Sequence, residues 1–337
     1  MGLNYREMGL KVGYFKPLGI KVLGFRGAMV DEDAEQAKAA FGLKESLEEI
    51  TPVMISPELY LRMLSGKGKL SGRVSKSFAK VSKGKDIVLI DGVGDFRAGR
   101  LLDLSDVDTA VMLKSKIILI SLYDSIYVLD EILSTVDVIR RYEKKSGRRI
   151  LAGIVFNNVP SSGMDELKST VIPFLKKKGI EVLGAIPRDK ILRSVRVKDI
   201  VEEVSGEVLT AKERGGTAIE SFLVGAMSPT HAIKYFRRRS NVAVITGGDR
   251  SDMQLAALEA RVNCLILTGS LMPSAPILAR ADELKIPLVL VKDDTISAVE
   301  KMEALLRRLQ VKGDVKINAI KSLIKDNLDL ERLDEVM

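Results

Sequence analysis

The chain has 337 residues, of which 46% are hydrophobic and 29% are charged, a balance that predicts a soluble globular protein of two domains. Only 5% of the residues are aromatic and Trp is absent, which argues against a surface that stacks aromatic rings on a ligand. The single cysteine, Cys264, has no partner for an internal disulfide and favours a reducing compartment. Residues 1–20 lack a signal-peptide pattern, and no segment has the roughly 18–20 apolar residues of a membrane span. We therefore expect a cytoplasmic protein that does not contact a membrane.

The formal net charge of +8 raises the question of a polyanionic partner. The basic clusters all lie at the ends of expected helices, where cations complement the helix dipole. They are Lys144-Lys145, Arg148-Arg149, Lys176-Lys177-Lys178 and Arg237-Arg238-Arg239. Solvated helix ends and an acidic-partner surface both remain open. Without interleaved aromatic residues or a recognition-helix pattern, we do not expect nucleic acid as a partner.

Strand-like runs alternate with amphipathic stretches in the first half, an order typical of parallel sheets with crossover helices. The runs are rich in Ile, Val and Leu, as strands covered on both faces should be. The expected strands are Lys11–Phe15, Asp86–Asp91, Lys116–Ser121, Ile150–Asn157 and Ile180–Ile186. The expected helices lie near residues 33–41, 57–64, 73–82, 125–145 and 164–177, the first framed by Asp33 and Gly42.

A second α/β unit begins near residue 205, after a boundary of alternating charged and apolar residues at 190–206. Its expected strands are Glu207–Thr210, Ser221–Gly225, Val242–Thr246, Cys264–Thr268 and Leu288–Val291. Its expected helices lie near 229–238, 251–260, 274–285 and 295–309. A charged helix over about 314–335 follows. The predicted domains are residues 1–204, 205–312 and 313–337.

The strand expected at Lys11–Phe15 resembles the second strand of a P-loop nucleotide-binding domain, and only Met1 to Leu10 precede it. A P-loop has the pattern G-x-x-x-x-G-K-[ST], whose backbone N–H groups cradle phosphate. This pattern does not occur in the 337 residues, since Gly66–Gly72 has Gly where Ser or Thr must stand. We expect a parallel-sheet domain that lacks the first strand and phosphate loop of that fold.

Polar residues follow several of the strands expected in the first half. Asp91, before Gly92, stands where open α/β sheets build their sites, and could orient Mg²⁺ or cap a turn. Lys16 could face a phosphate or be an exposed turn lysine. Asp31-Glu32-Asp33 could hold a metal or begin a helix. Asn157 offers a donor and an acceptor suited to a purine edge, or serves a turn.

Three polar loops follow strands of the second half, and they should meet at one edge of the sheet. They are Thr246–Asp252, Thr268-Gly269-Ser270 and Lys292–Thr295. A Gly247-Gly248 turn that leads into a helix makes an anion or small-ligand pocket plausible here, and capping by Ser251, Ser274 and Asp294 is the alternative. We expect the only histidine, His231, to be an ordinary residue of a first helical turn.

Several stretches of the chain resemble those of a known family. Its first half is similar to the dethiobiotin-synthetase-like domain in the amino-terminal part of long phosphotransacetylases, and its second half is similar to the DRTGG domain that follows there. The first half carries this likeness in Val12–Pro17, Asp31–Ala34, Ile90-Asp91-Gly92, Gly153–Pro160 and Leu183–Pro187. The second half carries it in Gly225–Pro229, Val244–Asp252 and Leu267-Thr268-Gly269.

The resemblance implies roles for individual positions. Lys16 would contact phosphate or substrate, Asp33 and Asp91 would hold Mg²⁺, Asn157 would read a nucleotide base, and Ile186-Pro187 would line the base pocket. In the second half, the expected ligand-binding residues are Gly247, Gly248, Asp249, Arg250 and Thr268. Dethiobiotin synthetases usually have Glu where Asp91 stands and Gly where Asp95 stands, and the DRTGG letters are matched only by Gly-Asp-Arg-Ser-Asp.

Two functions are compatible with these residues. The first is a non-catalytic sensor or regulatory protein that binds a nucleotide or an acyl-CoA-related metabolite. The second is an ATP-dependent carboxylate-activating ligase or ATPase of the dethiobiotin synthetase type, which requires a phosphate loop supplied upstream. The expected cofactor is ATP or ADP with Mg²⁺. The expected partners are a small-molecule ligand, a second copy of the chain in a homodimer, and an enzyme of acetate or acyl-CoA metabolism.

Overall fold

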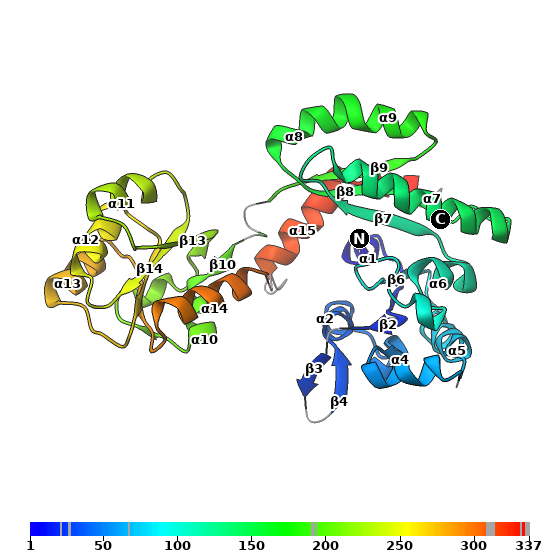
Figure 1. The fold of residues 1–337 in the computed structure, drawn as a ribbon, viewed down its shortest axis with the longest axis horizontal. Helices are drawn as coiled ribbons and strands as arrows, with labels where there is room; N and C mark the ends of the chain where they lie inside the picture. Colours follow the sequence, from blue (N-terminus) through cyan, green and yellow to red (C-terminus); the bar gives the residue numbers. More distant parts are fainter. Residues whose placement is uncertain are drawn as a thin grey trace. The chain divides into compact units, whose positions relative to one another are not determined.

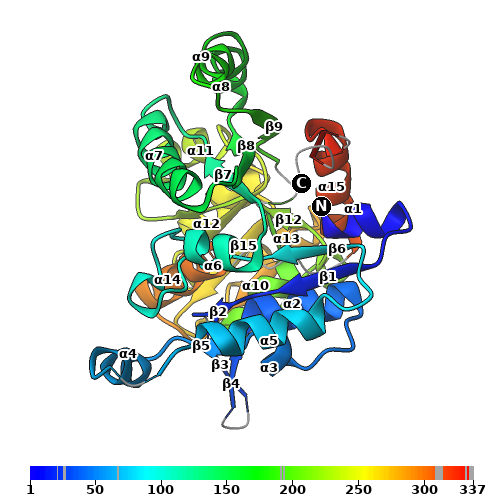
Figure 2. The same cartoon turned by 90° about the vertical axis from the view of Figure 1, so that its right-hand side faces the viewer.

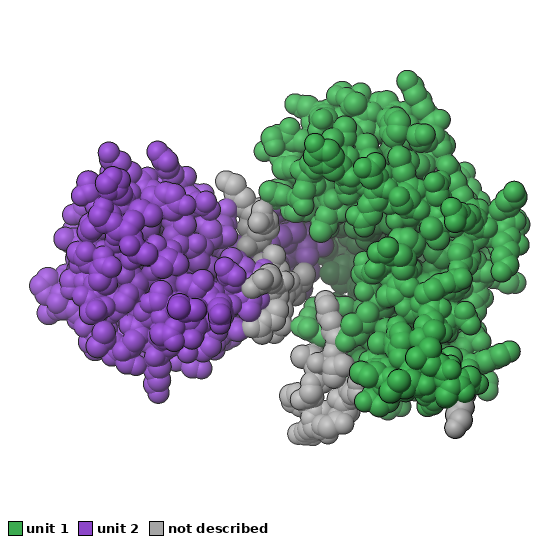
Figure 3. Space-filling view, in the orientation of Figure 1, with its two compact units in different colours: residues 1–188, 321–337 green, residues 189–320 purple. Residues whose placement is uncertain are grey.

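The computed structural model describes residues 1–20, 22–25, 28–66, 68–189, 192, 194–307, 314–330 and 332–333. The chain forms two compact units, unit 1 (residues 1–188 and 321–337) and unit 2 (residues 189–320), which Figure 3 distinguishes by colour. Both units are α/β with mainly parallel strands, as the sequence predicts. The predicted domains, residues 1–204, 205–312 and 313–337, have other limits than these two compact units. The predicted domain limits stay a prediction.

Unit 2 is built on one continuous five-stranded sheet in the order β11-β16-β15-β14-β13. Four strands are parallel, and the short edge strand β11 runs antiparallel to β16. The strands are β11 (Glu207–Val208), β13 (Ser221–Val224), β14 (Val242–Gly247), β15 (Cys264–Thr268) and β16 (Leu288–Leu290). The central strands β14 and β15 are buried almost throughout, which explains their unbroken apolar sequence.

Helices cover both faces of this sheet. Val244 and Leu265 pack with α11, α12 and α13 on one face, and Ile245 and Cys264 pack with α10 and α14 on the other. The helices are α10 (Val197–Val204), α11 (Pro229–Phe236), α12 (Ser251–Glu259), α13 (Ala275–Glu283) and α14 (Thr295–Arg307). The boundary segment expected at 190–206 therefore contains a helix of unit 2, preceded by β10 (Val195–Arg196), which pairs with β12 (Ala218–Ile219). Residues 308–309 of the last expected helix lie outside the described residues.

The long strands of unit 1 fall into two separate parallel groups. One contains β1 (Val12–Phe15) and β6 (Ile87–Ile90), which lie side by side in Figure 2. The other contains β7 (Ile117–Leu122), β8 (Leu151–Val159) and β9 (Val182–Pro187) in that order. All five strands were expected from the sequence, with small shifts at their ends.

Helices of unit 1 pack against each group. Helix α7 (Val128–Ser146) and the helical stretch α8 (Ser161–Glu166) to α9 (Ile172–Lys177), joined by a π-turn, lie on one side of β7–β9 (Figure 1). The β1–β6 pair packs with α4 (Pro57–Leu64) and α5 (Ser71–Val81) through a core around Phe15, and with α2 (Glu32–Phe41) through a core around Tyr14. Helix α6 (Asp106–Leu113) connects the two groups of strands, since it follows β6 and precedes β7.

Several short elements of unit 1 have no strong signal in the sequence. They are α3 (Leu47–Ile50), the parallel pair β2 (Leu18–Gly19) and β5 (Val53–Met54), and the hairpin β3 (Val22–Phe25) and β4 (Ala28–Asp31). Helix α1 (Gly2–Glu7), by contrast, lies within Gly2–Gly9, whose sequence is typical of the end of a helix. Helix α2 also starts earlier than expected, because Asp31 rather than Asp33 is its N-cap. The expected end at Gly42 is confirmed, and this glycine has the left-handed backbone that favours it.

The carboxyl-terminal segment is not one helix over 314–335. Helix α15 (Asp314–Asn327) ends at Asn327, and Leu328 forms an antiparallel bridge with Gly184 of β9. Leu328 and Leu333 are buried with Leu183 and Val155, on the face of β8 and β9 that α7 does not cover. The terminal segment thus completes the core of unit 1.

In the described part of the chain, no helix combines the length and the apolar character that crossing a bilayer requires.

The close contact between β9 and the terminal segment generates a prediction. A Cβ atom on Gly184 would lie 2.2 Å from the carbonyl oxygen of Asn327, so Gly184→Ala should push the segment away from β9. We expect faster hydrogen exchange over residues 321–330 and a loss of stability of about 1–3 kcal/mol. Gly72→Ala is the control, because a Cβ atom there meets nothing within 4 Å. Unchanged exchange in Gly184→Ala would show that the segment is not held by this contact.

Candidate functional site

A buried lysine surrounded by three carboxylates lies where β1 and β6 end. The Nζ atom of Lys16 is 2.6 Å from Asp33 Oδ2, 3.0 Å from Asp91 Oδ2 and 3.7 Å from Asp31 Oδ1. Lys16 is only 3% exposed, so its ammonium group depends on these partners for the solvation that water would give. We call Lys16, Asp31, Asp33 and Asp91 the lysine–carboxylate cluster. It is not the exposed turn lysine that the sequence allowed.

Three local structures assemble the cluster. The parallel register pairs Phe15 with Ile90, which places the next residues, Lys16 and Asp91, side by side. Asp31 caps helix α2 by accepting a hydrogen bond from the backbone N–H of Ala34, and Asp33 follows in the first turn. Asp31 and Asp33 therefore act as helix N-terminal residues and as partners of Lys16 at once, which confirms that they begin a helix, and their binding of a metal stays a prediction.

Burial and charge set the protonation of the cluster. Burial opposes the charge on Lys16, but hydrogen bonds and ion pairs with Asp33 and Asp91 raise its pKa above the ordinary value, so the ammonium stays charged. Burial and the neighbouring Asp91 also raise the pKa of Tyr14, whose hydroxyl donates a hydrogen bond to Asp91 Oδ2 at 2.7 Å. Asp91 Oδ2 therefore accepts hydrogen bonds from both the Tyr14 hydroxyl and the Lys16 ammonium.

A fourth carboxyl group, that of Asp106, lies nearby, and the charge of Lys16 and a backbone hydrogen bond at Val93 only partly offset its burial. Burial, followed by the charges of Asp91 and Asp95, raises the pKa of Asp106 from 3.8 to about 6. Asp106 begins helix α6 and lies against Gly92, where a Cβ atom would come within 2.4 Å of its Oδ2 atom. Gly92 therefore allows the loop after β6 to pass close to a carboxylate, which a larger residue would prevent.

The sequence predicted Asp33 and Asp91 as magnesium ligands, and the structure brings both onto one cation, the ammonium of Lys16. No group of three or more His, Cys, Asp or Glu side chains placed to hold a metal occurs among the described residues. A divalent cation at Asp33 and Asp91 would therefore have to compete with Lys16 for their oxygens. The magnesium-binding role of these two residues remains a prediction.

The expected base-pocket residues lie on the other group of strands. Asn157 is on β8, opposite Leu122 of β7, and Ile186 and Pro187 end β9. Pro187 pairs with Val159 near the end of β8, so the three residues share the carboxyl end of this sheet. Asn157, Ile186 and Pro187 are all partly exposed there, and their contact with a base stays a prediction.

In unit 2 the polar loops meet at one edge of the sheet, as expected for parallel strands. Gly247 of β14 pairs with Thr268 of β15, and Gly248 donates a backbone hydrogen bond to the Thr268 carbonyl at 3.0 Å. The Thr268 hydroxyl is 2.9 Å from the hydroxyl of Thr295, which begins α14. We call this region the carboxyl edge of unit 2.

Charged side chains of both signs surround this edge. The Arg250 guanidinium pairs with Asp252 at 2.9 Å, and Lys301 pairs with Asp293 at 2.7 Å. Asp249 is exposed, and Arg250 rather than Ser251 is the N-cap residue of α12. Asp294 does cap α14, since it accepts a hydrogen bond from the N–H of Ser297.

Two buried polar atoms at the carboxyl edge, Thr246 Oγ1 and Gln254 Oε1, have no hydrogen-bond partner within the part of the chain that the structure describes. Thr246 is 2% exposed and Gln254 is fully buried. The amide nitrogen of Gln254 donates to the carbonyl groups of Gly247 and Gly248 at 3.1 and 2.9 Å, so this residue fixes the glycine turn. The sequence interpretation missed Gln254, although a polar residue among apolar ones one turn after Gly247-Gly248 was a usable signal.

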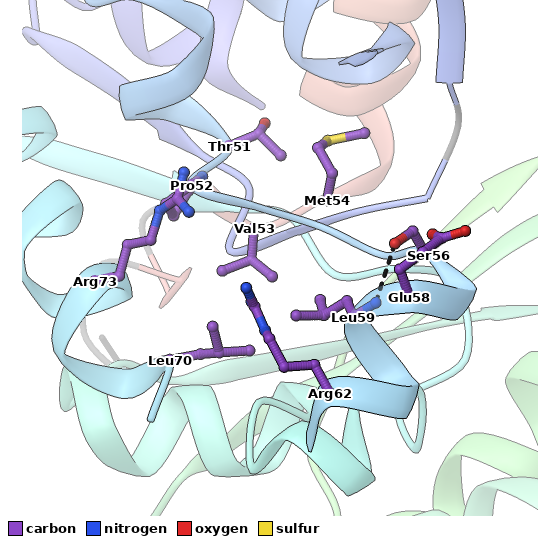
Figure 4. A pocket seen from close by; sticks show the side chains of 10 residues that line it. All are labelled: Thr51, Pro52, Val53, Met54, Ser56, Glu58, Leu59, Arg62, Leu70 and Arg73. Atoms are coloured by element: carbon purple, nitrogen blue, oxygen red, sulfur yellow. Dashed lines mark hydrogen bonds between the residues drawn. The ribbon is translucent and has the colours of Figure 1, made fainter. Parts of the chain in front are cut away.

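A pocket of about 370 Å³ between α4 and α5 was also missed (Figure 4). Arg62 and Arg73 contribute two guanidinium groups to its lining, and Glu58 contributes the one carboxylate. Figure 4 shows the Arg62 side chain pointing from α4 towards Val53. Arg62 lies on α4 and Arg73 on α5. The motifs considered in the sequence all follow strands, so none of them includes these two arginines.

His231 and Cys264 occupy the places that the sequence predicts. His231 lies in the first turn of α11, with Nδ1 2.8 Å from Ser228 Oγ. Cys264 is fully buried in β15, and burial raises the pKa of its thiol to about 12, so it stays protonated.

The raised pKa of Asp106 predicts a pH-dependent effect on stability. A carboxyl whose folded-state pKa lies above its unfolded value favours folding below about pH 4 and loses that contribution as pH rises through 6. We expect Asp106→Asn to increase the free energy of unfolding at pH 8 by about 1–3 kcal/mol and to have little effect at pH 4. Urea unfolding followed by circular dichroism measures this. Asp103→Asn is the control, since that carboxylate is exposed. An equal effect at both pH values would contradict the electrostatic cause.

The two parts of the chain match two known families. Residues 1–196 match the AAA domain, and residues 199–305 match the DRTGG domain. Phosphate acetyltransferase of Pseudomonas putida is 24% identical over 336 residues, covering 95% of this chain and 47% of that protein. Phosphate acetyltransferase of Nitratidesulfovibrio vulgaris is 22% identical over 334 residues, covering 96% of this chain and 47% of that protein. The chain spans about half the length of these curated relatives.

A solved structure is similar to part of the chain, the CBS and DRTGG domains of the regulatory region of Clostridium perfringens pyrophosphatase, complexed with its activator diadenosine tetraphosphate. It shares 16% identity and a TM-score of 0.32, covering 50% of this chain and 84% of that chain. The resemblance read from the sequence is confirmed by the family matches. The chain belongs to the AAA domain family, carries a DRTGG domain after it, and is distantly related to the amino-terminal region of phosphate acetyltransferases.

Proposed function

We propose that this protein is a non-catalytic, ligand-sensing regulatory protein, and that it binds a nucleotide or an acyl-CoA-related metabolite at the carboxyl edge of unit 2. The observation that carries the proposal is the pair of buried, unpartnered atoms Thr246 Oγ1 and Gln254 Oε1 beside the Gly247-Gly248 turn. Buried polar atoms without partners are rare in folded proteins, because each one loses its hydrogen bonds to water. A ligand that supplies those bonds would be stabilised by them.

The chemistry of the edge favours a nucleotide-like ligand. Gln254 Oε1 is able to accept a hydrogen bond, and the Thr246 hydroxyl is able to donate or accept one, which suits an amino group or a sugar hydroxyl. Arg250 and Lys301 add cations whose present partners, Asp252 and Asp293, are carboxylates that a phosphate group would replace. A ligand with both kinds of group, such as ATP or coenzyme A, would match the edge.

The lysine–carboxylate cluster supports a role without catalysis. Lys16 already neutralises Asp33 and Asp91, the two carboxylates that the family resemblance assigns to Mg²⁺. Because Lys16 is buried, releasing them would leave its ammonium with Asp31 alone, at 3.7 Å, which is unfavourable. Unit 1 would then serve as a scaffold that responds to a ligand or passes a signal to a partner enzyme of acetate or acyl-CoA metabolism, in a homodimer.

The second candidate is an ATP-dependent carboxylate-activating ligase or ATPase. The convergence of Asp33 and Asp91 on a single cation favours it, because a magnesium site needs oxygens placed in this way. It also needs a phosphate loop, which the 337 residues do not contain.

Calorimetric titration of ATP with Mg²⁺, and separately of acetyl-CoA, into the full chain tests the proposal. We expect Thr246→Val to weaken binding of one of these ligands by about tenfold, because the buried hydroxyl loses its partner in the ligand. We also expect this variant to be at least as stable as the parent without ligand, since an unpartnered hydroxyl is removed.

Thr217→Val is the matched control, because Thr217 lines a hollow with Asn263 and Lys285 at the opposite edge of the sheet. ATP binding that survives Thr246→Val but is lost in Asp91→Asn would support the second candidate. No heat from either ligand would contradict both.

A further inference from the structure

The pocket between α4 and α5 contains two arginines that make no ion pair in the fold. It has a volume of about 370 Å³, which is within the range of small-molecule sites. Figure 4 shows the side chain of Arg62 pointing from α4 towards Val53 and that of Arg73 pointing from α5 towards Pro52. Among the described residues, neither guanidinium group has a carboxylate or another hydrogen-bond acceptor as a partner. Two cations therefore line one space, and no described side chain pairs with either of them.

The one carboxylate of the pocket is engaged at the start of α4. Glu58 lies in the first turn of this helix, and a hydrogen bond with the Ser56 side chain, followed by one with its own backbone, lowers its pKa. The Ser56 side chain is the N-cap of α4, because its oxygen accepts a hydrogen bond from the backbone N–H of Leu59 at 3.2 Å. Ser56 and Glu58 thus stabilise the amino end of α4, and they leave the charges of the arginines to a ligand.

The sequence around the pocket concentrates positive charge. Residues 59–85 contain eight Lys and Arg residues and no Asp or Glu, whereas the whole chain has 53 basic and 45 acidic residues. Arg73 lies in the first turn of α5, where the helix dipole disfavours a cation, and no acidic residue accompanies it in that turn. Arg62 lies in the last turn of α4, where the dipole favours a cation. Helix stability therefore accounts for the charge of Arg62 and does not account for that of Arg73.

The wall between the arginines is apolar and fixed in place. Val53, Leu59 and Leu70 line the pocket, and each of them is at most 9% exposed. All three belong to the hydrophobic core around Phe15, and Val53 is also held in β5 by the pairing of that strand with β2. The pocket is therefore formed before a ligand arrives. Charges beside buried apolar groups are screened less by water than charges on an open surface, so an anion there is attracted more strongly.

We propose that this pocket binds a small organic phosphate, a phosphate monoester with a short hydrocarbon body. The phosphate group would lie between Arg62 and Arg73, because a guanidinium group donates two parallel hydrogen bonds to phosphate oxygens. A monoester carries nearly two negative charges at neutral pH and neutralises both arginines, whereas a carboxylate would neutralise one. The hydrocarbon body would pack on the apolar wall. This second site goes beyond the ligand proposed for unit 2 and does not depend on it.

Calorimetric titration of mono-n-butyl phosphate into the full chain at pH 8 tests the proposal. We expect saturable binding, and hydrogen exchange should show new protection at residues 51–62 and 70–74 and none in unit 2. Inorganic phosphate should bind about tenfold more weakly, because it has no hydrocarbon to pack on the apolar wall. n-Butyl sulfate should also bind more weakly, because it has a similar shape and only one negative charge.

Two variants and a matched control locate the ligand. Arg62→Gln and Arg73→Gln should each weaken the binding of n-butyl phosphate by about tenfold or more, because each removes charge-assisted hydrogen bonds. Both side chains are exposed, so these variants should fold as the parent chain does. Lys76→Gln is the control, since it removes one positive charge from an exposed position of α5 that does not line the pocket. We expect unchanged binding in this variant.

Four results would overturn the proposal. n-Butyl phosphate could release no heat and protect no residue of the pocket. Lys76→Gln could weaken binding as much as Arg73→Gln, which would show a general attraction to a basic surface. Binding could survive both arginine variants and be lost in Arg250→Gln, which would place the phosphate at the carboxyl edge of unit 2. A short peptide that contains phosphoserine could bind more tightly than n-butyl phosphate, which would assign the pocket to a phosphorylated protein.

Discussion

The placement of one ammonium group constrains the first half of the chain. Lys16 is 3% exposed and charged, and a buried charge without partners is too unfavourable to persist in a folded protein. The end of β1, the end of β6 and the amino terminus of α2 must therefore meet, since each supplies one element of the lysine–carboxylate cluster. The same requirement fixes Asp31 as both helix cap and ion-pair partner, and it holds Tyr14 against Asp91.

Sequence reasoning succeeded where a general rule of backbone geometry applies. Gly247 and Thr268 are the last residues of two parallel strands, and parallel strands end at one edge, so their proximity could be predicted without side-chain information. The ion pairs of Lys16 could not be predicted in this way, because the register of β1 against β6 and the turn before α2 decide which carboxylates it meets. The end of α15 at Asn327 was missed because the bridge from Leu328 to Gly184 is a long-range contact with no local signal.

The two units differ in how completely their sheets are satisfied. In unit 2 both faces of the sheet carry helices, and the unpartnered atoms are side-chain atoms at the carboxyl edge. In unit 1, among the residues that the structure describes, β6 pairs with β1 alone and β7 with β8 alone, and apolar side chains such as Ile120 are exposed. Unpartnered side-chain atoms such as those of unit 2 suit a small ligand that brings a few hydrogen bonds.

The lysine–carboxylate cluster and Asp106 are electrostatically connected. Asp91 belongs to the cluster, and its charge contributes to the raised pKa of Asp106. Lys16 acts in the opposite direction, because its positive charge lowers the pKa of Asp106. The ion pair between Lys16 and Asp91 therefore moderates the repulsion that Asp91 exerts on Asp106.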